Sequence, residues 1–326
     1  MPHPRTTETD TAPLRVLVIH RRTGSTVRYI DQVVGEDESG VDYRFGRALL
    51  AQTDLDVVFL PRFGSLFGAQ GPTGPRLVLE TLRVGRDLQR RGIALVRTLT
   101  EADRQGGRWP RLAARVLDRF TSAFVVFDDS VKPPTGKPVT VIPYADHRDR
   151  FLGYPRAAQV PGRVLWVGAS RLGPGLQELV AVSPPPSGVR FVGAADAPTR
   201  ALLDGCDART ERLSDGALVQ EISAAELVVV PSVEEPEDLS AVYLSLAVDR
   251  PVLVPDTAAM RALQSQVGAT WLPLLPAALD SAALAEIVAD VALPLPGARP
   301  SLPGASLNDT AKRYATVFRA AASTAR

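Results

Sequence analysis

Short apolar runs alternate with amphipathic stretches along most of the chain, a pattern typical of βα units and of a parallel sheet. Strands are predicted at the apolar runs of the first half of the sequence, at 14–20, 55–61, 93–99, 123–129 and 138–144. Helical periodicity lies between several of these runs, at 24–34, 75–91 and 109–121. The pattern then restarts, with predicted strands at 163–170, 188–194, 225–232, 250–256 and 269–275. The helices predicted there lie near 197–205, 215–223, 239–249, 258–267 and 280–291.

Two successive series of βα units indicate an α/β chain with two Rossmann-like domains that face a cleft. A last amphipathic stretch predicts a helix that closes the fold, with Asn308 or Asp309 as its cap. The predicted divisions are a disordered tail at 1–13, an N-terminal domain at 14–155, a linker at 156–162, a C-terminal domain at 163–306 and the closing helix at 307–326.

Composition limits the classes of partner. The chain has 326 residues, which is enough for about two domains. Its formal net charge of +1 creates no strong field that would attract nucleic acid, so no nucleic-acid partner is expected. The single cysteine, Cys206, cannot form an intrachain disulfide and fits a cytoplasmic protein. No apolar run approaches the ~18 residues that a membrane-spanning helix needs.

Four carboxylates stand in one turn between a buried strand and a helix, in "ELVVVPSVEEPEDLSAVYLSLAVDRPVLVPD" (226–256). After them, apolar residues at helical spacing predict an amphipathic helix that Asp238 or Ser240 would cap. Such acids can merely complement the dipole of the helix and solvate the turn. Alternatively, the amides at Ser240 and Ala241 hold a diphosphate, and Glu234 or Glu235 accepts hydrogen bonds from sugar or ribose hydroxyls. A nucleotide-sugar would supply both groups.

The order of the motifs resembles that of GT-B-type glycosyltransferases. "VLWVGASRLGPGLQELV", "VRFVGAAD" and "RLSDGALVQEISAAELVVVPS" are similar to the opening strand and phosphate loop, the second strand and the segment before the donor loop of that family's C-terminal domain. "VLVIHRRTGSTVRYIDQV" and "VIPYADHRDRF" are similar to a group of actinobacterial transferases. The resemblance covers about residues 14–275. It implies an N-terminal acceptor domain and a C-terminal donor domain.

The same resemblance implies transfer of a sugar from a nucleotide-diphosphate-sugar to a carbohydrate or lipid-linked acceptor. It places Ser170 and Arg171 at the donor, with Arg171 neutralising the leaving diphosphate. Such a protein would need no cofactor and could be peripheral to the inner face of the membrane. The Asp128–Asp129 pair lies in no context that demands a bound Mg²⁺, so no metal site is expected.

Residues of the N-terminal half complete the expected site. Glu101, Asp103 or His20 would assist the acceptor, although structural roles for these side chains are equally open. Gly24, Ser25 and Thr26 would bring helix amides to an acceptor or a phosphate, but they do not form a GxGxxG motif. Tyr144, Asp146 and Arg148 would lie at the hinge and cleft. "PRFGSLFGAQGPTGP" (61–75) would form a mobile acceptor-side loop with exposed aromatics.

Several positions depart from the family pattern. Leu244 stands where the second glutamate of retaining members would fall, and Pro174 stands where a lysine of the phosphate loop is usual. "TLTE" and "IPYA" also differ from the usual "TLHN" and "IPHG". Two explanations compete, namely a subfamily that holds its donor differently and a catalytically degenerate homologue that regulates or scaffolds an active transferase. The clustered His and acid motifs of a nucleotide-sugar 2-epimerase are not found.

Overall fold

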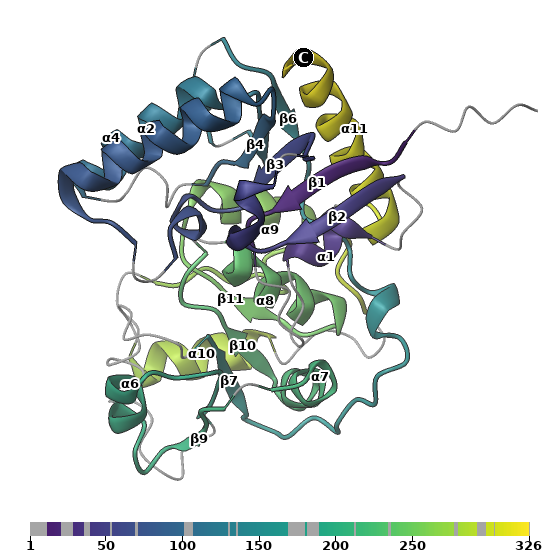
Figure 1. Ribbon diagram of the computed structural model, residues 1–326. Helices are drawn as coiled ribbons and strands as arrows, with labels where there is room; N and C mark the ends of the chain where they lie inside the picture. The colour runs from purple at the N-terminus through teal and green to yellow at the C-terminus, as the bar shows by residue number, and fades with distance from the viewer. Residues whose placement is uncertain are drawn as a thin grey trace, which may run out of the picture.

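The computed structural model describes residues 12–20, 29–35, 40–52, 54–68, 71–100, 107–129, 131–134, 136–168, 180, 189–211, 213–233, 236–276, 280–291, 298–302 and 304–325. They form two α/β lobes, with the N-terminal lobe in the upper half of Figure 1 and the C-terminal lobe below it.

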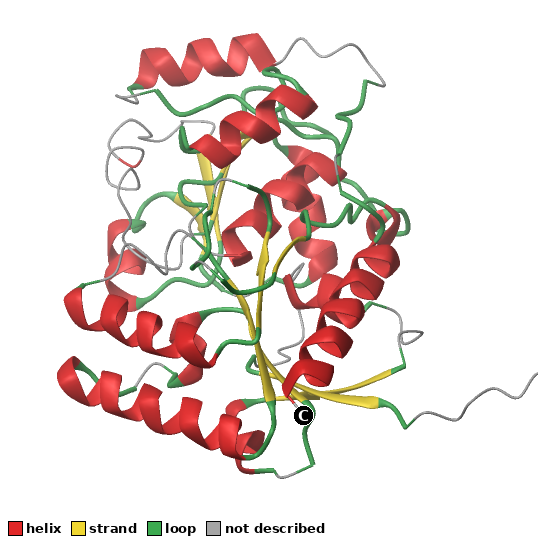
Figure 2. Ribbon diagram, turned by 90° about the horizontal axis from the view of Figure 1, so that it is seen from above, coloured by secondary structure: helices red, strands yellow, loops and turns green. Residues whose placement is uncertain are grey.

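The N-terminal lobe is built on a six-stranded parallel sheet of order β2-β1-β3-β4-β5-β6. Its strands are β1 Leu14–Val18, β2 Val41–Phe45, β3 Val57–Leu60, β4 Ala94–Thr98, β5 Ala123–Val126 and β6 Val139–Val141. Alternation along these strands sends apolar side chains to both faces, as expected of a sheet covered by helices on each side. Figure 2 shows the strands inside and helices around them.

Different helices cover the two faces of this sheet. The α-helices of the lobe are α1 Tyr29–Val34, α2 Gly74–Arg90 and α4 Arg108–Phe120, and short 3₁₀ turns lie at Arg47–Ala51, Phe63–Leu66 and Asp149–Phe151. Helices α2 and α4 pack on the face that carries Leu17 and Val58. Helix α1 packs on the opposite face, which carries Val16 and Phe59.

The C-terminal lobe repeats the plan with a five-stranded parallel sheet of order β11-β10-β7-β8-β9. Its strands are β7 Val164–Val167, β8 Val189–Val192, β9 Asp207–Arg209, β10 Leu227–Val229 and β11 Val252–Leu253. Its helices are α6 Ala197–Leu202, α7 Asp215–Ala224, α8 Pro236–Ala247, α9 Ala258–Val267 and α10 Ser281–Val291. The predicted α/β class with two parallel sheets is confirmed.

The last helix, α11 (Leu307–Ala325), returns to the N-terminal lobe, where it packs against α1, β3 and β4 (Figure 1). The returning chain runs beside the outgoing one, because Asp146 and Ser306 form a parallel bridge and the Asp146 amide donates to the Ala305 carbonyl at 2.9 Å. Both crossings between the lobes therefore lie side by side.

Some sequence-based expectations need correction. Strands β2 and β9 were not predicted, and the run 269–275 forms no strand, only a bridge between Leu274 and Val254. The hydroxyl of Ser306, rather than Asn308 or Asp309, caps α11 by accepting from the Asp309 amide at 3.1 Å. Helix α8 begins before Asp238 and Ser240, so neither is its cap.

One expected loop aromatic is also not exposed. The Phe63 ring is buried in the core under α2 and lies 6.5 Å from the Phe67 ring. The prediction that this aromatic side chain is free to meet an acceptor is therefore wrong.

Candidate functional site

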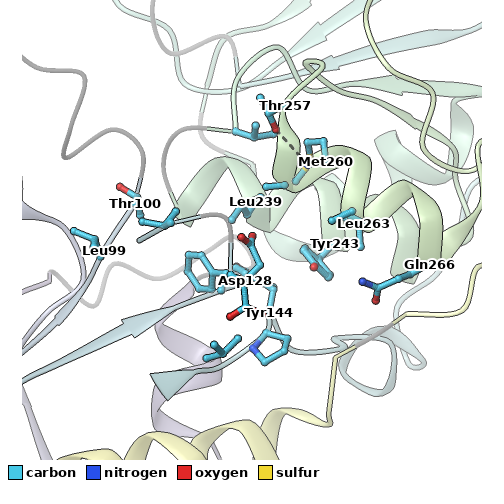
Figure 3. A pocket seen from close by; sticks show the side chains of 18 residues that line it. Leu99, Thr100, Asp128, Tyr144, Leu239, Tyr243, Thr257, Met260, Leu263 and Gln266 are labelled. Carbon is cyan, nitrogen blue, oxygen red and sulfur yellow. Dashed lines mark hydrogen bonds between the residues drawn. The ribbon is translucent and has the colours of Figure 1, made fainter. Parts of the chain in front are cut away.

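A cavity of about 400 Å³ lies between the two lobes, at the carboxyl ends of β4, β5 and β6 (Figure 3). The N-terminal lobe lines it with residues that directly follow these strands, among them Leu99, Thr100 and Asp128. The C-terminal lobe lines it with residues of α8 and α9 and with Val233, which follows β10. Ligands of parallel α/β sheets bind at the carboxyl ends of strands, so this interlobe pocket is the candidate site.

The charged side chains that line the interlobe pocket, among the described residues, are both acidic. Its charged lining residues, among those that the structure describes, are Asp128, which is half-buried, and Asp129, which is exposed. No arginine, lysine or histidine of the described ranges lines it. The carboxylate of Asp128 points into the cavity between Leu239 and Tyr243 (Figure 3). The Asp128 carboxylate can accept a hydrogen bond from a ligand in the cavity.

Two stacked tyrosines form the wall beside Asp128. The Tyr144 and Tyr243 rings lie 4.7 Å apart with an interplanar angle of 20°. Burial, and then the negative charge of Asp128, raise the pKa of Tyr243 well above its usual value, so this phenol stays protonated at neutral pH. The Tyr144 and Ser240 hydroxyls share a hydrogen bond across the lobes. The wall thus joins the predicted hinge residue Tyr144 to the predicted donor residue Ser240.

Helix α9 forms the opposite wall. Its N-cap is Thr257, whose hydroxyl accepts from the Met260 amide at 3.2 Å, as the dashed line in Figure 3 shows. Met260 and Leu263 then present apolar side chains to the cavity, with Gln266 at its edge. The sequence after β11 therefore builds a largely apolar surface opposite Asp128.

The other predicted hinge residues lie at the paired crossings. The Asp146 carboxylate accepts from the Arg148 amide at 2.8 Å. The Arg148 guanidinium reaches the carbonyls of Leu246 and Pro300 at 3.4 and 3.3 Å and pairs with Asp249 at 3.2 Å. These contacts tie the outgoing chain to α8 and to the returning chain. A role in cleft closure stays a prediction.

Two further predicted residues are described but do not line the interlobe pocket. His20 follows β1 and is half-buried. Ala241 lies on α8 next to Ser240, beyond the start of the helix at Pro236. The remaining predicted site residues lie outside the described residues: Gly24, Ser25, Thr26, Glu101, Asp103, Ser170, Arg171, Glu234 and Glu235. Their roles stay predictions, although Glu101 directly follows the pocket residue Thr100.

Sequence reasoning missed Asp128 as a site residue. Its signal was an acid directly after a strongly apolar strand, at the sheet edge where ligands bind. An acid after an apolar strand is common. Asp128 is identified as a pocket residue only because α8 and α9 pack next to it in the structure. Elsewhere, the described ranges contain no group of three or more His, Cys, Asp and Glu side chains placed to hold a metal ion, and no helix that could cross a bilayer.

No family model matches the chain. A GDP-mannose:glycolipid 4-beta-D-mannosyltransferase from Xanthomonas campestris pv. campestris is 30% identical over 231 residues, which is 66% of this chain and 65% of that protein. A second sequence of the same description is 29% identical over 231 residues. The matched region thus spans less than two thirds of these curated relatives.

Solved structures share the architecture over nearly the whole chain. AviGT4, a glycosyltransferase involved in avilamycin A biosynthesis, superposes with a TM-score of 0.53 and 14% identity over 95% of this chain and 98% of its own. HepE from Anabaena, in complex with UDP and glucose, superposes with a TM-score of 0.55 and 14% identity over 96% of this chain and 95% of its own. The predicted resemblance to GT-B-type glycosyltransferases is confirmed, and the chain has the GT-B fold.

Proposed function

We propose that this GT-B chain is a glycosyltransferase that moves a sugar from a nucleotide-diphosphate-sugar to a carbohydrate or glycolipid acceptor. The observation that carries the proposal is the 231-residue match to the mannosyltransferases, whose description names a nucleotide-sugar donor and a glycolipid acceptor. The fold supports it, because the carboxyl ends of the first sheet open into a pocket that the second lobe closes.

The two lobes would divide the substrates between them. The donor would bind to the C-terminal lobe, with Arg171 and helix amides neutralising the diphosphate as it leaves. The acceptor would bind to the N-terminal lobe. The bond between the transferred sugar and the diphosphate would break as the acceptor oxygen forms the new glycosidic bond. We expect this chemistry to proceed without a metal ion.

The nature of the acceptor also suggests where in the cell the protein works. A glycolipid acceptor with a cytoplasmic nucleotide-sugar implies a cytoplasmic protein that works as a peripheral protein at the inner face of the membrane. Assembly of polysaccharides on lipid carriers is a process that would need such a transfer.

A nucleotide screen tests this proposal. Thermal shift should show stabilisation by one of GDP, UDP, dTDP and ADP and by the matching nucleotide-sugar, because a ligand that binds only the folded state raises its melting temperature. EDTA should leave the shift unchanged. Loss of the shift with EDTA would refute the metal-free donor site.

Arg171 provides the matched variants for that screen. Arg171→Ala should weaken binding of the stabilising nucleotide by about 10- to 100-fold, since a hydrogen bond to a charged group contributes about 1.5–3 kcal/mol. Arg171→Lys should restore only part of the affinity, because the guanidinium fork is lost. Arg111→Ala, at an exposed position of α4, is the control and should bind like wild type. Equal binding by wild type and Arg171→Ala would place the diphosphate elsewhere.

One observation favours the second candidate, a catalytically degenerate homologue that scaffolds an active transferase. Leu244, which stands where retaining members carry a glutamate, is 1% exposed and belongs to the core. No carboxylate could be retained at that position without a buried charge. If no nucleotide stabilises the protein, this second candidate replaces the first.

A further inference from the structure

The two outer helices of the N-terminal lobe carry a charge that the rest of the chain does not share. Helices α2 and α4 together hold eight arginines and three acids, a formal charge of +5, whereas the whole chain has a formal net charge of +1. One of the three acids, Asp118, pairs with the buried Arg97 at 2.5 Å and is thus used inside the lobe. Positive charge is therefore concentrated on one small part of the molecule.

The exposed arginines of α2 form one stripe along the helix. The members of the stripe are Arg76, Leu79, Arg83, Arg86 and Arg90, and each of these side chains is exposed. Their spacing of three and four residues places them on a single face of the helix. The opposite face of α2 is buried on the sheet.

Helix α4 repeats this arrangement beside α2. Its exposed stripe consists of Arg108, Arg111, Leu112, Arg115 and Arg119, and its opposite face is buried on the same side of the sheet as that of α2. The two helices pack against each other and lie side by side on the outside of the lobe (Figure 1). Both stripes therefore face outward on the same side of the molecule, each with four arginines and one leucine.

Apolar side chains accompany the arginines. Leu79 is 46% exposed and Leu112 is 40% exposed, although both are large apolar residues. The half-buried Trp109 ring lies next to the Arg108 guanidinium, which is 5.1 Å from the ring centroid. Arginine, leucine and tryptophan together suit the headgroup region of a bilayer, because charged heads meet lipid phosphates there while apolar parts reach the acyl boundary.

The way in which the two helices are packed determines how they could meet a bilayer. Their apolar faces are already buried on the sheet, so neither helix can insert that face into lipid as a free amphipathic helix does. Binding would come mainly from attraction between the arginine stripes and anionic headgroups. The 17 residues of α2 extend for about 25 Å, so the stripes can contact several headgroups at once.

The position of the stripes fits an enzyme that works on a membrane-bound substrate. The helices between parallel strands run antiparallel to them, so α2 and α4 both begin at the carboxyl edge of the sheet. The interlobe pocket borders the same edge, where its lining residue Thr100 precedes α4 in the chain. A bilayer on the stripes would therefore lie beside the end of the lobe that carries the candidate site.

We propose that the arginine stripes of α2 and α4 are the surface by which this protein binds a bilayer that contains anionic lipids. This inference rests on the proposed function only for the membrane as the place of action. The guanidinium groups bind lipid phosphates, while Leu79, Leu112 and Trp109 contact the acyl boundary. The affinity rises with the density of anionic lipid and falls with salt.

Sedimentation of the full chain with vesicles tests the lipid partner. Vesicles of phosphatidylcholine with about one third phosphatidylglycerol should bind the protein at least ~100-fold more tightly than vesicles of phosphatidylcholine alone. Raising NaCl from about 0.05 M to about 0.5 M should release the protein, because salt screens the attraction between exposed charges. Equal binding to both kinds of vesicle, or binding that salt leaves unchanged, would overturn the proposal.

A matched pair of fourfold variants locates the surface. The stripe variant combines Arg86→Gln, Arg90→Gln, Arg111→Gln and Arg115→Gln. It should bind the anionic vesicles on the order of 10²-fold more weakly than wild type, since each basic residue near such a surface contributes ~5-fold. The control variant removes the same charge from exposed positions of α6, α9 and α11, by Arg200→Gln, Arg261→Gln, Lys312→Gln and Arg313→Gln.

The control variant should bind the vesicles within about threefold of wild type, because charges far from the bilayer are screened. A melting temperature close to that of wild type shows that each variant folds. Equal binding by the two variants would show that overall charge rather than the stripes sets the affinity, and the surface would be wrongly placed. If the stripe variant keeps its vesicle binding but loses affinity for duplex DNA of random sequence, the partner is a nucleic acid and the lipid assignment is wrong.

The nucleotide screen separates this inference from the proposed function. If a nucleotide stabilises wild type but the anionic vesicles do not bind it, the docking surface is refuted and the transferase stands. If the vesicles bind through the stripes but no nucleotide stabilises the protein, the transferase is refuted and the surface belongs to the scaffolding homologue.

Discussion

At the scale of the residue, the imidazole of His147 is fully buried against the Tyr144 ring, 5.5 Å away between centroids. Neither ring nitrogen has a hydrogen-bond partner among the described residues. Burial, and then the positive charge of Arg150, lower its pKa from 6.5 to about 3. Folding therefore keeps this side chain neutral at pH values where the unfolded chain would protonate it.

This burial predicts an acid-sensitive stability. Because the folded pKa lies below the unfolded one, the unfolded state binds the proton first, and stability falls as the pH drops from about 6.5 towards about 3. The whole difference is on the order of 3–5 kcal/mol, from about 1.36 kcal/mol per pKa unit. His147→Phe keeps a ring at the position and should flatten the denaturation free energy between these pH values relative to wild type. Parallel pH curves for the two proteins would contradict the prediction.

At the scale of the element, α2 and α4 pack so closely on the first sheet that one position admits only glycine. A Cβ added to Gly85 would lie 2.3 Å from Cδ2 of Phe120. Glycine is otherwise unfavourable inside a helix, by about 1 kcal/mol relative to alanine. The close approach of the two helices explains why it stands there.

Gly85→Ala should therefore destabilise the protein by about 1–3 kcal/mol, the usual cost of overpacking, despite its better helix propensity. Phe120→Leu should relieve the clash, so the double variant should be more stable than the sum of the single changes implies. Gly216→Ala in α7 is the control, because its nearest neighbour, a Tyr154 ring carbon, would be 3.4 Å away. Chemical denaturation measures all four. Equal effects of Gly85→Ala and Gly216→Ala would refute the steric argument.

At the scale of the whole molecule, Arg150 links the two lobes through one ion pair with each lobe. Arg150 binds Asp31 of α1 at 2.5 Å and Asp215 of α7 at 3.2 Å, and all three side chains are less than one third exposed. The lobes also share one apolar cluster, in which Val16 and Phe59 of the first lobe are continuous with Val242 and Leu246 of the second. We expect the two lobes to unfold together.

Arg150→Gln should lower the free energy of unfolding by about 1–2 kcal/mol, below the value for a buried charged hydrogen bond because the pairs are partly solvated. Asp31→Asn and Asp215→Asn should each add less in the Arg150→Gln background than alone, since the ion pair of each with Arg150 is already lost there. Arg83→Gln is the control, because its pair with Glu80 is exposed and lies within one helix. A second denaturation transition in wild type would show that the lobes are not coupled.

A site residue could be predicted from the sequence when it belongs to a local motif, but not when only contacts with distant segments place it in the site. Tyr144, Asp146 and Arg148 were predicted at the cleft from a motif, and the structure places them at the crossings. Asp128 was not predicted, because its neighbours Leu239 and Tyr243 are more than a hundred positions away in sequence. Periodicity reports local burial only and is silent on such pairs.

The sequence by itself determined the alternation of strands and helices. Short apolar runs mark strands that are buried on both faces, and helical spacing marks helices that are buried on one face, and both patterns are local properties of the sequence. It failed at the edge strands β2 and β9, whose side chains are mostly half-exposed and lack the apolar signal. It also failed at 269–275, where Leu272 is fully buried without any strand, because burial alone does not require one. Only the tertiary structure decided three other features: the paired crossings between the lobes, the need for glycine at position 85 between α2 and α4, and the pocket around Asp128. Each of them depends on contacts between segments that are distant along the chain.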